Sequence, residues 1–452
     1  MSRAPSSFPV LHGYDADSPV GWQRGEPITA ARFCAAALEL AGKLPRKRHV
    51  LNLCEDRLNF MLGFAAALIA GQTNLLPPSR AGGVIREIFA SYPDTCCLAD
   101  HNELPAGLPA MIVPPWPPAP GNGFDIPCVA ADHLAMIVFT SGSTGRPQPH
   151  TKSWRSLVAA ARGLARRLDI LAGQRVSMLG TVPPQHMYGL ETTVMLPLQN
   201  GIAVHSARPL LPADVAAALA ELPAARWLAT TPLQLRAAIG ECAAFPRLAG
   251  VLSATMPLPG ELARAVEERW GVPVHEIYGC TEAGTVALRR PARETRWRAC
   301  ADVRVWRKAD DTWIAGGHLD GELKLPDCVE VVGEGEFILL GRPGDMVKIA
   351  GKRTSLEALN CELLRIAGVR DGVFFLPERD GADEQRVAAL VVAPRLEQEA
   401  ILCALRERID PAFLPRPLIL VDALPRNATG KLAREGLLAL AREALARVRR
   451  RA

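Results

Sequence analysis

The stretch from Phe139 to Pro149, FTSGSTGRPQP, constrains this chain more than any other. The apolar segment that leads into it, Leu134–Phe139, is short enough for a buried strand and too short for an ordinary helix. Glycines in such a loop permit backbone angles that other residues resist and leave room for a close anionic ligand. The stretch therefore predicts a loop at a strand end that binds a polyphosphate through backbone N–H groups and hydroxyls. The candidate ligand-binding residues are Thr140, Ser141, Gly142, Ser143, Thr144 and Gly145.

This loop differs from the common phosphate loop, which needs a Gly, four residues and then Gly-Lys before a helix. The alternative is a surface turn rich in Ser and Gly. The run Thr140–Pro147, TSGSTGRP, resembles the nucleotide loop of the adenylate-forming superfamily, which includes acyl- and aryl-CoA synthetases, nonribosomal adenylation domains and luciferases. Further segments that resemble this family follow downstream in the family's order.

The length and composition are those of a large globular protein. A chain of 452 residues exceeds what one hydrophobic core usually fills, so two or more domains are expected. The longest apolar run, Phe60–Gly71, is too short to cross a bilayer, and residues 1–20 lack the apolar stretch of a secretory signal, which predicts a cytoplasmic protein. Scattered cysteines and a modest net charge of +5 predict neither a zinc site nor a nucleic-acid partner.

Strand-like and helix-like segments alternate along the chain, which is typical of an α/β fold. Val50–Leu53 is predicted to be a strand, and Phe60–Ala70 a buried helix. The proline-rich segment 105–120 is predicted to be a connection without regular structure, because proline lacks a backbone N–H. It leads to the strand before the phosphate loop.

The string His186-Met-Tyr-Gly189 follows a predicted strand, Val176–Leu179. A histidine at such a place is ordinarily a hydrogen-bonded scaffold residue. The string resembles the family's substrate-gate segment and follows the phosphate loop at the family's distance. The resemblance implies that His186 lies between the acid pocket and the nucleotide.

The segment Val274–Gly284, VHEIYGCTEAG, is predicted to be an apolar strand followed by a turn, and it resembles the family's Y-G-x-T-E motif. A strand-end turn with a capping Glu is the alternative. The resemblance implies that Tyr278 stacks on adenine, that Thr281 donates to the α-phosphate and that the Glu282 carboxylate is an oxygen ligand for Mg²⁺. Upstream, Ser253–Pro257 stands where the family has a Gly-Gly-Ala stretch, so larger side chains should narrow the site.

Asp327 and Arg342 are separated as in the family's ribose-binding Asp and the Arg of its G-R-x-x-D segment. A carboxylate can accept both ribose hydroxyls, and a guanidinium can hold ribose or phosphate oxygens. The family's Thr-Gly before the Asp is replaced by Leu325-Pro326, so the local turn is expected to differ.

The segment Gly341–Gly351 resembles the family's hinge and the first hairpin of its small domain. The resemblance implies a large amino-terminal α/β domain, residues 1–344, and a small mobile α+β domain, residues 345–452, with Asp345 as the hinge. Lys348 and Gly351 would lie on the hairpin that the hinge motion brings to the active site.

The string from Pro425 to Lys431, PRNATGK, resembles the family's closing motif P-x-x-x-x-G-K. A lysine on a glycine turn is ordinarily solvated. The resemblance implies that Lys431 instead reaches the active site and neutralises charge that grows between the carboxylate and the α-phosphate. Gln148 stands where the family commonly has a lysine, which removes one cation from the pyrophosphate side.

The resemblance implies an ATP-dependent, Mg²⁺-dependent carboxylic acid ligase. It would form an acyl- or aryl-adenylate and then a thioester with a phosphopantetheine thiol, on coenzyme A or on an acyl carrier protein. The narrow site favours a compact aromatic acid. The basic helix predicted over residues 432–452 is either a docking element for an acidic carrier protein or a solvated tail. Two alternatives remain: an adenylate-forming enzyme with a non-thiol acceptor, and a degenerate nucleotide-binding module without catalysis.

Overall fold

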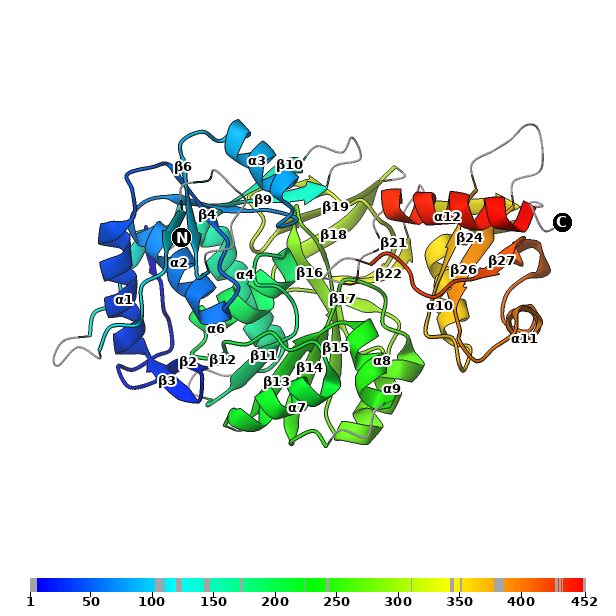
Figure 1. The fold of residues 1–452 in the computed structure, drawn as a ribbon, viewed down its shortest axis with the longest axis horizontal. Coiled ribbons are helices and arrows are strands. Elements are labelled where there is room, and N and C mark those ends of the chain that lie inside the picture. The colour runs from blue at the N-terminus through cyan, green and yellow to red at the C-terminus, as the bar shows by residue number, and fades with distance from the viewer. Residues whose placement is uncertain are drawn as a thin grey trace.

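The fold is mixed α/β, as the alternation of segments predicts. The computed structural model describes residues 6–101, 108, 110–118, 124–141, 147–170, 174–223, 225–240, 244–309, 311–341, 345–349, 352–377, 386–426, 430, 432 and 434–449. Figure 1 shows one large body and, at one end of it, the carboxy-terminal segment drawn in orange and red. Within these described ranges, no helix combines the length and the apolar character that crossing a membrane requires.

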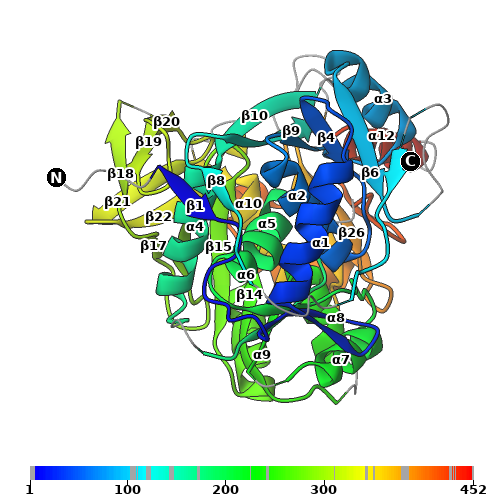
Figure 2. The same ribbon diagram turned by 90° about the vertical axis from the view of Figure 1, so that its left-hand side faces the viewer.

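The first large sheet has six strands in the order β10-β9-β5-β4-β6-β7. Helix α1 begins after Thr29, whose hydroxyl accepts a hydrogen bond from the Arg32 N–H at 3.3 Å, and α2 is apolar on all sides and buried. Figure 2 shows α1 and α2 beside β4 and β6. The elements are β4 (His49–Asn52), β5 (Thr73–Leu76), β6 (Thr95–Ala99), β7 (Ala110–Ile112), β9 (Leu134–Ser141), β10 (Pro147–Ser153), α1 (Ala30–Lys43), α2 (Arg57–Ile69) and α3 (Gly82–Ser91).

Two sequence predictions in this region need correction. The proline-rich segment is not wholly irregular, because Ala110–Ile112 pairs with β6 in parallel at the sheet edge, where prolines on either side of a short strand do no harm. The strand before the phosphate loop is also longer than predicted. It continues through Thr140 to Ser141 and pairs with β10 in antiparallel register, so the phosphate loop closes a hairpin.

The second large sheet has eleven strands in the order β21-β22-β17-β16-β15-β14-β13-β11-β12-β2-β3. Helices α7, α8 and α9 share one hydrophobic cluster with β11, β13, β14 and β15 and cover one face of the sheet. The elements are β2 (Pro19–Gln23), β3 (Glu26–Thr29), β11 (Ser177–Gly180), β12 (Ala203–His205), β13 (Arg226–Thr230), β14 (Leu248–Ser253), β15 (Val274–Cys280), β16 (Gly284–Arg289), β17 (Trp297–Ala299), β21 (Cys328–Gly333), β22 (Glu336–Gly341), α7 (Pro212–Glu221), α8 (Pro232–Gly240) and α9 (Gly260–Trp270).

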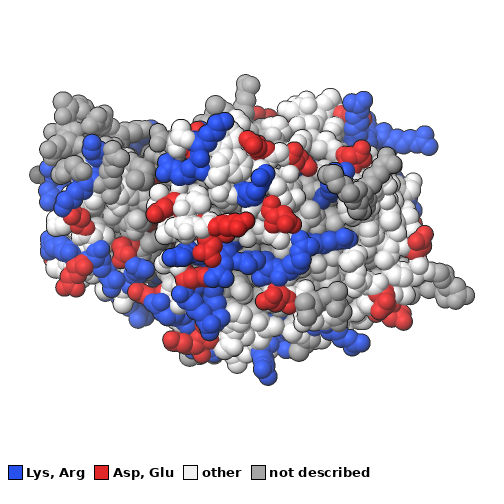
Figure 3. Space-filling model, turned by 180° about the vertical axis from the view of Figure 1, so that it is seen from behind, with Lys and Arg blue, Asp and Glu red and all other residues white. Residues whose placement is uncertain are grey.

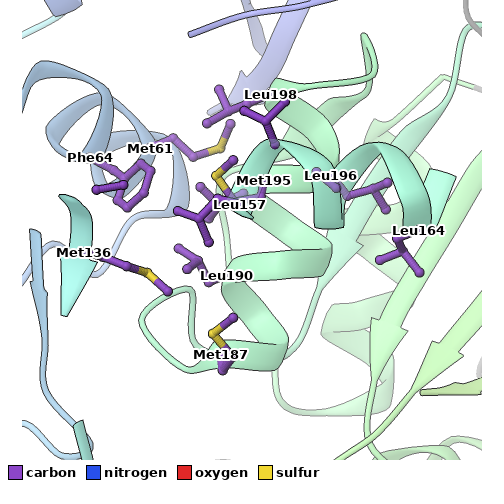
Figure 4. Close-up of a cluster of buried hydrophobic side chains, with 14 of the residues drawn as sticks. Met61, Phe64, Met136, Leu157, Leu164, Met187, Leu190, Met195, Leu196 and Leu198 are labelled. Atoms are coloured by element: carbon purple, nitrogen blue, oxygen red, sulfur yellow. The ribbon is translucent and has the colours of Figure 1, made fainter. Parts of the chain in front are cut away.

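A buried cluster of methionine and leucine side chains lies between the two sheets (Figure 4). Met136 enters it from the strand that leads to the phosphate loop, and Met187 and Leu190 enter it from the segment that follows His186. Closely packed side chains pass a movement of one on to its neighbours, so this cluster mechanically couples β9 to the predicted substrate-gate segment. The elements here are α4 (Trp154–Arg167), α5 (Met187–Leu190), a π-helical turn η1 (Glu191–Met195) and α6 (Leu196–Leu198).

The remaining elements form small sheets. The carboxy-terminal segment has hydrophobic clusters of its own, which include Val347, Leu363 and Leu390, and it contains both strands and helices. The elements are β1 (Ser7–Pro9), β8 (Cys128–Ala130), β18 (Val303–Lys308), β19 (Asp311–Gly316), β20 (Leu323–Lys324), β23 (Met346–Ile349), β24 (Lys352–Ser355), β25 (Asp371–Phe375), β26 (Ala388–Val392), β27 (Leu418–Leu420), α10 (Leu356–Leu364), α11 (Gln398–Arg406), the 3₁₀ turn η3 (Pro411–Phe413) and α12 (Arg434–Arg449).

Candidate active site

Six neighbouring strands of the eleven-stranded sheet are parallel, from β2 through β12, β11, β13 and β14 to β15, and their carboxyl ends lie along one edge. The last residues of β11, β13, β14 and β15 are Gly180, Thr230, Ser253 and Cys280. In open α/β sheets, ligands bind outside the carboxyl ends of the strands. The predicted gate, the Ser253–Pro257 segment and the Y-G-x-T-E motif all begin at these ends.

The phosphate-loop hairpin lies next to the turn that carries Glu282. Thr140 Oγ1 and His150 Nε2 are 3.2 Å apart, and the same His150 nitrogen lies 3.6 Å from Glu282 Oε1. The sequence prediction missed His150, although its alternation with Gln148 on β10 places both on one face of the strand. Gly142, Ser143, Thr144 and Gly145 lie outside the described residues, as does the side chain of Ser141.

The Y-G-x-T-E motif is divided between a strand and a turn. Tyr278, Gly279 and Cys280 continue β15, so the turn is shorter than predicted and contains Thr281, Glu282 and Ala283. Antiparallel pairing with β16 extends the strand. The side chain of Glu282 is 39% exposed, so its carboxylate remains accessible to a ligand.

Tyr278 and Asp327 come together, although 49 positions separate them in the sequence. The Tyr278 hydroxyl donates to Asp327 Oδ2 at 2.8 Å, and its ring packs against Trp297 and Phe337 with centroid distances of 5.5 and 5.7 Å. These contacts fix the ring and leave Asp327 half-buried at the site. Arg342 lies outside the described residues.

The predicted gate segment is anchored to the sheet by a tyrosine. His186 is half-buried and precedes the first turn of α5. The Tyr188 hydroxyl donates to the carbonyls of Thr230 at 3.1 Å and Leu252 at 2.9 Å, at the ends of β13 and β14. Burial raises the pKa of Tyr188 far above its usual range, so it remains a hydrogen-bond donor.

The segment after β14 is strained and polar. Thr255 has φ +78°, in the left-handed region that a β-branched residue rarely adopts. Strain of this kind persists where the surrounding structure imposes it, often at functional sites. The hydroxyls of Ser253 and Thr255 are buried and have no hydrogen-bond partner among the described residues. A ligand at the strand ends would offset the cost of burying them.

The carboxy-terminal motif reaches this strained segment. A Cβ at Gly430 would lie 3.9 Å from both Thr255 Oγ1 and Met256 Sδ. The Arg426 guanidinium donates to the Gly430 carbonyl at 2.8 Å and forms two hydrogen bonds of 2.7 Å with Asp371. Lys431 itself lies outside the described residues, but its neighbour Gly430 lies beside Thr255 and Met256, directly after β14.

Asp345 and Lys348 lie at the start of the carboxy-terminal segment. Asp345 is half-buried and directly precedes β23, on which Lys348 is exposed; Gly351 lies outside the described residues. The segment also contacts the large body through Arg236 of α8, whose Nη1 donates to the carbonyls of Leu364 and Val369, both at 3.1 Å.

The residues near the phosphate-loop hairpin fit a magnesium ion that is held mainly by its nucleotide. Within the described residues, no group of three or more His, Cys, Asp or Glu side chains could hold a metal by itself. Mg²⁺ is commonly bound by one or two carboxylates together with phosphates and water. Glu282, whose carboxylate lies 3.6 Å from His150, can supply one such oxygen.

His318, which contacts the turn that carries Glu282, should make the stability of the protein depend on pH. Its Nε2–H donates to the Ala283 carbonyl at 2.9 Å, and burial lowers its pKa to about 4. The unfolded state therefore binds more protons between pH 4 and 6.5, so stability falls as the pH falls through this window. We expect a contribution of about 3 kcal/mol to the free energy of unfolding, lost by pH 4. Urea unfolding of His318→Gln, which keeps the donor but does not titrate, should lack this loss; equal pH profiles would contradict the assignment.

The architecture and the polar groups at its strand ends are those of a nucleotide-binding α/β enzyme. The family model described as AMP-binding enzyme matches residues 28–303, more than half of the chain. The protein belongs to the AMP-binding enzyme family, which confirms its predicted membership of the adenylate-forming superfamily.

Curated relatives and solved structures agree with this family. A 4-coumarate–CoA ligase of Rhodobacter capsulatus is 28% identical over 314 residues, which cover 68% of this chain and 77% of that protein. A sulfoacetate–CoA ligase of Cupriavidus necator is 27% identical over 404 residues, 78% of this chain and 74% of the relative. The O-succinylbenzoate coenzyme A synthetase of Bacillus subtilis in complex with AMP has a TM-score of 0.79 at 17% identity and covers 95% of this chain and 98% of its own, which confirms the fold.

Proposed function

We propose that this protein is an ATP-dependent acid–thiol ligase that forms an acyl- or aryl-adenylate and then a thioester. Its membership of the AMP-binding family and its CoA-ligase relatives support AMP-forming ligation of an acid to coenzyme A. The observation that carries most weight is the meeting of the phosphate-loop hairpin with the Glu282 turn, through His150, beside the strand ends.

In this proposal the adenosine of ATP binds between Tyr278 and Asp327. Tyr278 stacks on adenine, and Asp327 accepts the ribose hydroxyls with help from Arg342. The Tyr278–Asp327 hydrogen bond supports this role because it orients the carboxylate before the nucleotide arrives. The phosphates lie against the N–H groups and hydroxyls of the loop, with Thr140 at its start and Thr281 at the α-phosphate.

The acid carboxylate attacks the α-phosphorus while pyrophosphate leaves. Negative charge grows on the oxygens around phosphorus, so fixed cations and N–H donors are what the step needs. Lys431 is the proposed cation, and His186 separates the acid from the nucleotide. A bound Mg²⁺ would neutralise phosphate charge, with Glu282 as its protein ligand.

The thiol acceptor is coenzyme A or an acyl carrier protein. Figure 3 shows basic and acidic side chains interleaved over the described part of one face, so net charge alone does not define a carrier site there. The predicted carboxy-terminal helix is α12, and its inner face contains the buried residues Ala441 and Ala444. Its basic residues would be the place for an acidic carrier protein. We favour coenzyme A because the named relatives are CoA ligases.

The acid is proposed to be compact, with an aromatic acid favoured. Thr255 and Met256 occupy the segment at the end of β14, and Tyr188 bridges the ends of β13 and β14, so bulky groups line this part of the site. The relatives act on an aromatic acid and on a short one, so their substrates fit a compact pocket without choosing between the two classes.

Pyrophosphate release with ATP and a panel of benzoates, cinnamates, short acids and fatty acids tests the function. Release with a compact acid, followed by thioester formation only when coenzyme A is present, would support it. Release without any thiol dependence would favour a non-thiol acceptor. Binding of ATP without release for any acid would favour a non-catalytic nucleotide-binding module.

Glu282→Gln tests the proposed metal ligand. We expect pyrophosphate release to fall about tenfold to a hundredfold and to recover partly in excess Mg²⁺, because an amide is a weaker ligand than a carboxylate. Asp311→Asn, a change in an exposed ion pair with Lys324, is the control. Indifference of Glu282→Gln to the Mg²⁺ concentration would remove this residue from the metal site.

A further inference from the structure

The turn that carries Thr281 and Glu282 is held from behind by three buried side chains. Lys152 Nζ donates to the main-chain carbonyl of Glu282, and His318 Nε2 donates to the carbonyl of Ala283 at 2.9 Å. The Glu191 carboxylate accepts hydrogen bonds from Thr285 N at 3.1 Å and Thr285 Oγ1 at 2.6 Å. Each residue from Glu282 to Thr285 except Gly284 therefore has a fixed polar partner.

These three side chains are unusual in their burial. Lys152, Glu191 and His318 are 5%, 4% and 6% exposed. Removing a charged group from water costs several kcal/mol, and an apolar residue would fill the same space at lower cost. Burial lowers the pKa of Lys152 and raises that of Glu191, whereas each charge favours the ionised form of the other. The two side chains thus compensate each other behind the turn.

Gly284 shows how closely the carboxylate fits. Its φ is +79°, and a Cβ there would lie 2.4 Å from Glu191 Oε1. The Glu191 side chain therefore packs directly on the backbone of the hairpin formed by β15 and β16, and only glycine at position 284 allows this approach.

The three side chains come from separate segments of the site. Lys152 lies on β10, the strand that returns from the phosphate loop, and Glu191 begins η1, directly after the gate segment. His318 follows β19, and its carbonyl accepts a hydrogen bond of 2.6 Å from Ser156 of α4. A displacement of the phosphate-loop hairpin or of the gate segment would therefore move a side chain that holds the Glu282 turn.

We propose that Lys152, Glu191 and His318 are positioning residues that hold the Thr281–Glu282 turn at the phosphate-loop hairpin. They do not touch the nucleotide; they fix the backbone from which Thr281 and Glu282 project. This inference rests on the proposed function for the roles of Thr281 and Glu282, but the holding of the turn can be measured without turnover.

The test compares Lys152→Met with the double variant Lys152→Met/Glu191→Gln. The single variant leaves the Glu191 charge uncompensated, so the protein should be less stable and the Glu282 turn should no longer be held in place. The double variant removes both charges and keeps an acceptor for Thr285, so the thermal midpoint of the ligand-free protein should return toward that of the wild type. The carbonyl of Glu282 nevertheless remains without its donor. Lys324→Met, a change of an exposed lysine paired with Asp311, is the matched control.

The first measurement is the alkylation rate of Cys280 by iodoacetamide in the ligand-free protein, determined by peptide mass spectrometry. Cys280 adjoins the turn and is half-buried, and burial raises its pKa to about 12. Loss of the Lys152 charge alone would raise that pKa further and slow the reaction, so acceleration reports opening of the turn. We expect both Lys152 variants to react at least about fivefold faster. A wild-type rate in the double variant would overturn the proposal.

The second measurement is the Mg²⁺ concentration for half-maximal binding of α,β-methylene-ATP by calorimetry. We expect it to rise about tenfold in the double variant despite recovered stability, as for lost partners of a metal ligand. An unchanged value, with Glu282→Gln strongly shifted, would overturn the positioning role. If Glu282→Gln is also unchanged while Cys280 reacts faster, the turn is held as proposed and the metal-ligand role of Glu282 is wrong.

Discussion

Replacement of Lys431 by alanine should nearly abolish acyl-adenylate formation while ATP still binds. The cation is needed most where charge grows in the transition state, so its loss should lower the rate more than the affinity. We expect pyrophosphate release to fall by about 100-fold or more, the cost of removing a group that stabilises developing charge. Release within threefold of the wild type would contradict the role of Lys431.

A second variant, at Arg426, should have a smaller effect than Lys431→Ala. Arg426 donates to the carbonyl of Gly430, which lies close to Thr255, and forms two hydrogen bonds with Asp371. Arg426→Gln should loosen the turn without removing the Lys431 cation, so its loss of rate should be smaller than that of Lys431→Ala. Arg406→Gln, in an exposed pair with Glu399, is the control for loss of a guanidinium.

Much of the fold could be predicted because its segments carry strong local signals. The buried helix α2 is a continuous apolar run from Phe60 onward, and α1 begins directly after Thr29, whose hydroxyl caps it. The predictions that are wrong concern segments whose structure depends on pairing with another strand. Ala110–Ile112 forms β7 because it pairs with β6 at the edge of the sheet, and β15 extends through Cys280 because β16 pairs with it. Neither partner can be recognised from the local sequence.

The candidate site could be predicted in its nucleotide motifs but not in its supports. The resemblance to the family identifies both Tyr278 and Asp327 as nucleotide contacts, and the structure brings them into a hydrogen bond. Lys152 and His318 gave no signal, because a lysine on a strand and a histidine after a glycine pair are ordinarily solvated. Their importance follows from burial against carbonyls far away in the sequence, which periodicity and spacing do not encode.

The backbone at Asp345 should separate the two half-reactions. We propose that it is the hinge between a large domain, residues 1–344, and a small domain, residues 345–452. Phe337, just before it on β22, belongs to the core of the large body, whereas Val347, just after it on β23, belongs to a core of the carboxy-terminal segment. Few residues therefore remain between the two cores to absorb a rotation.

Asp345→Pro should restrict this rotation, because proline fixes φ near about −65°, removes an N–H and restricts the preceding residue. In the present arrangement Gly430 already lies against Thr255, so the adenylating pose requires no rotation in this proposal. Pyrophosphate exchange should therefore fall only severalfold, whereas thioester formation from preformed acyl-adenylate should fall by about 100-fold, since it requires the small domain to turn. Asp345→Ala, which leaves the backbone free, is the control and should retain both rates. Equal losses in the two half-reactions of Asp345→Pro, or none in either, would place the boundary elsewhere or show that thioester formation needs no rotation.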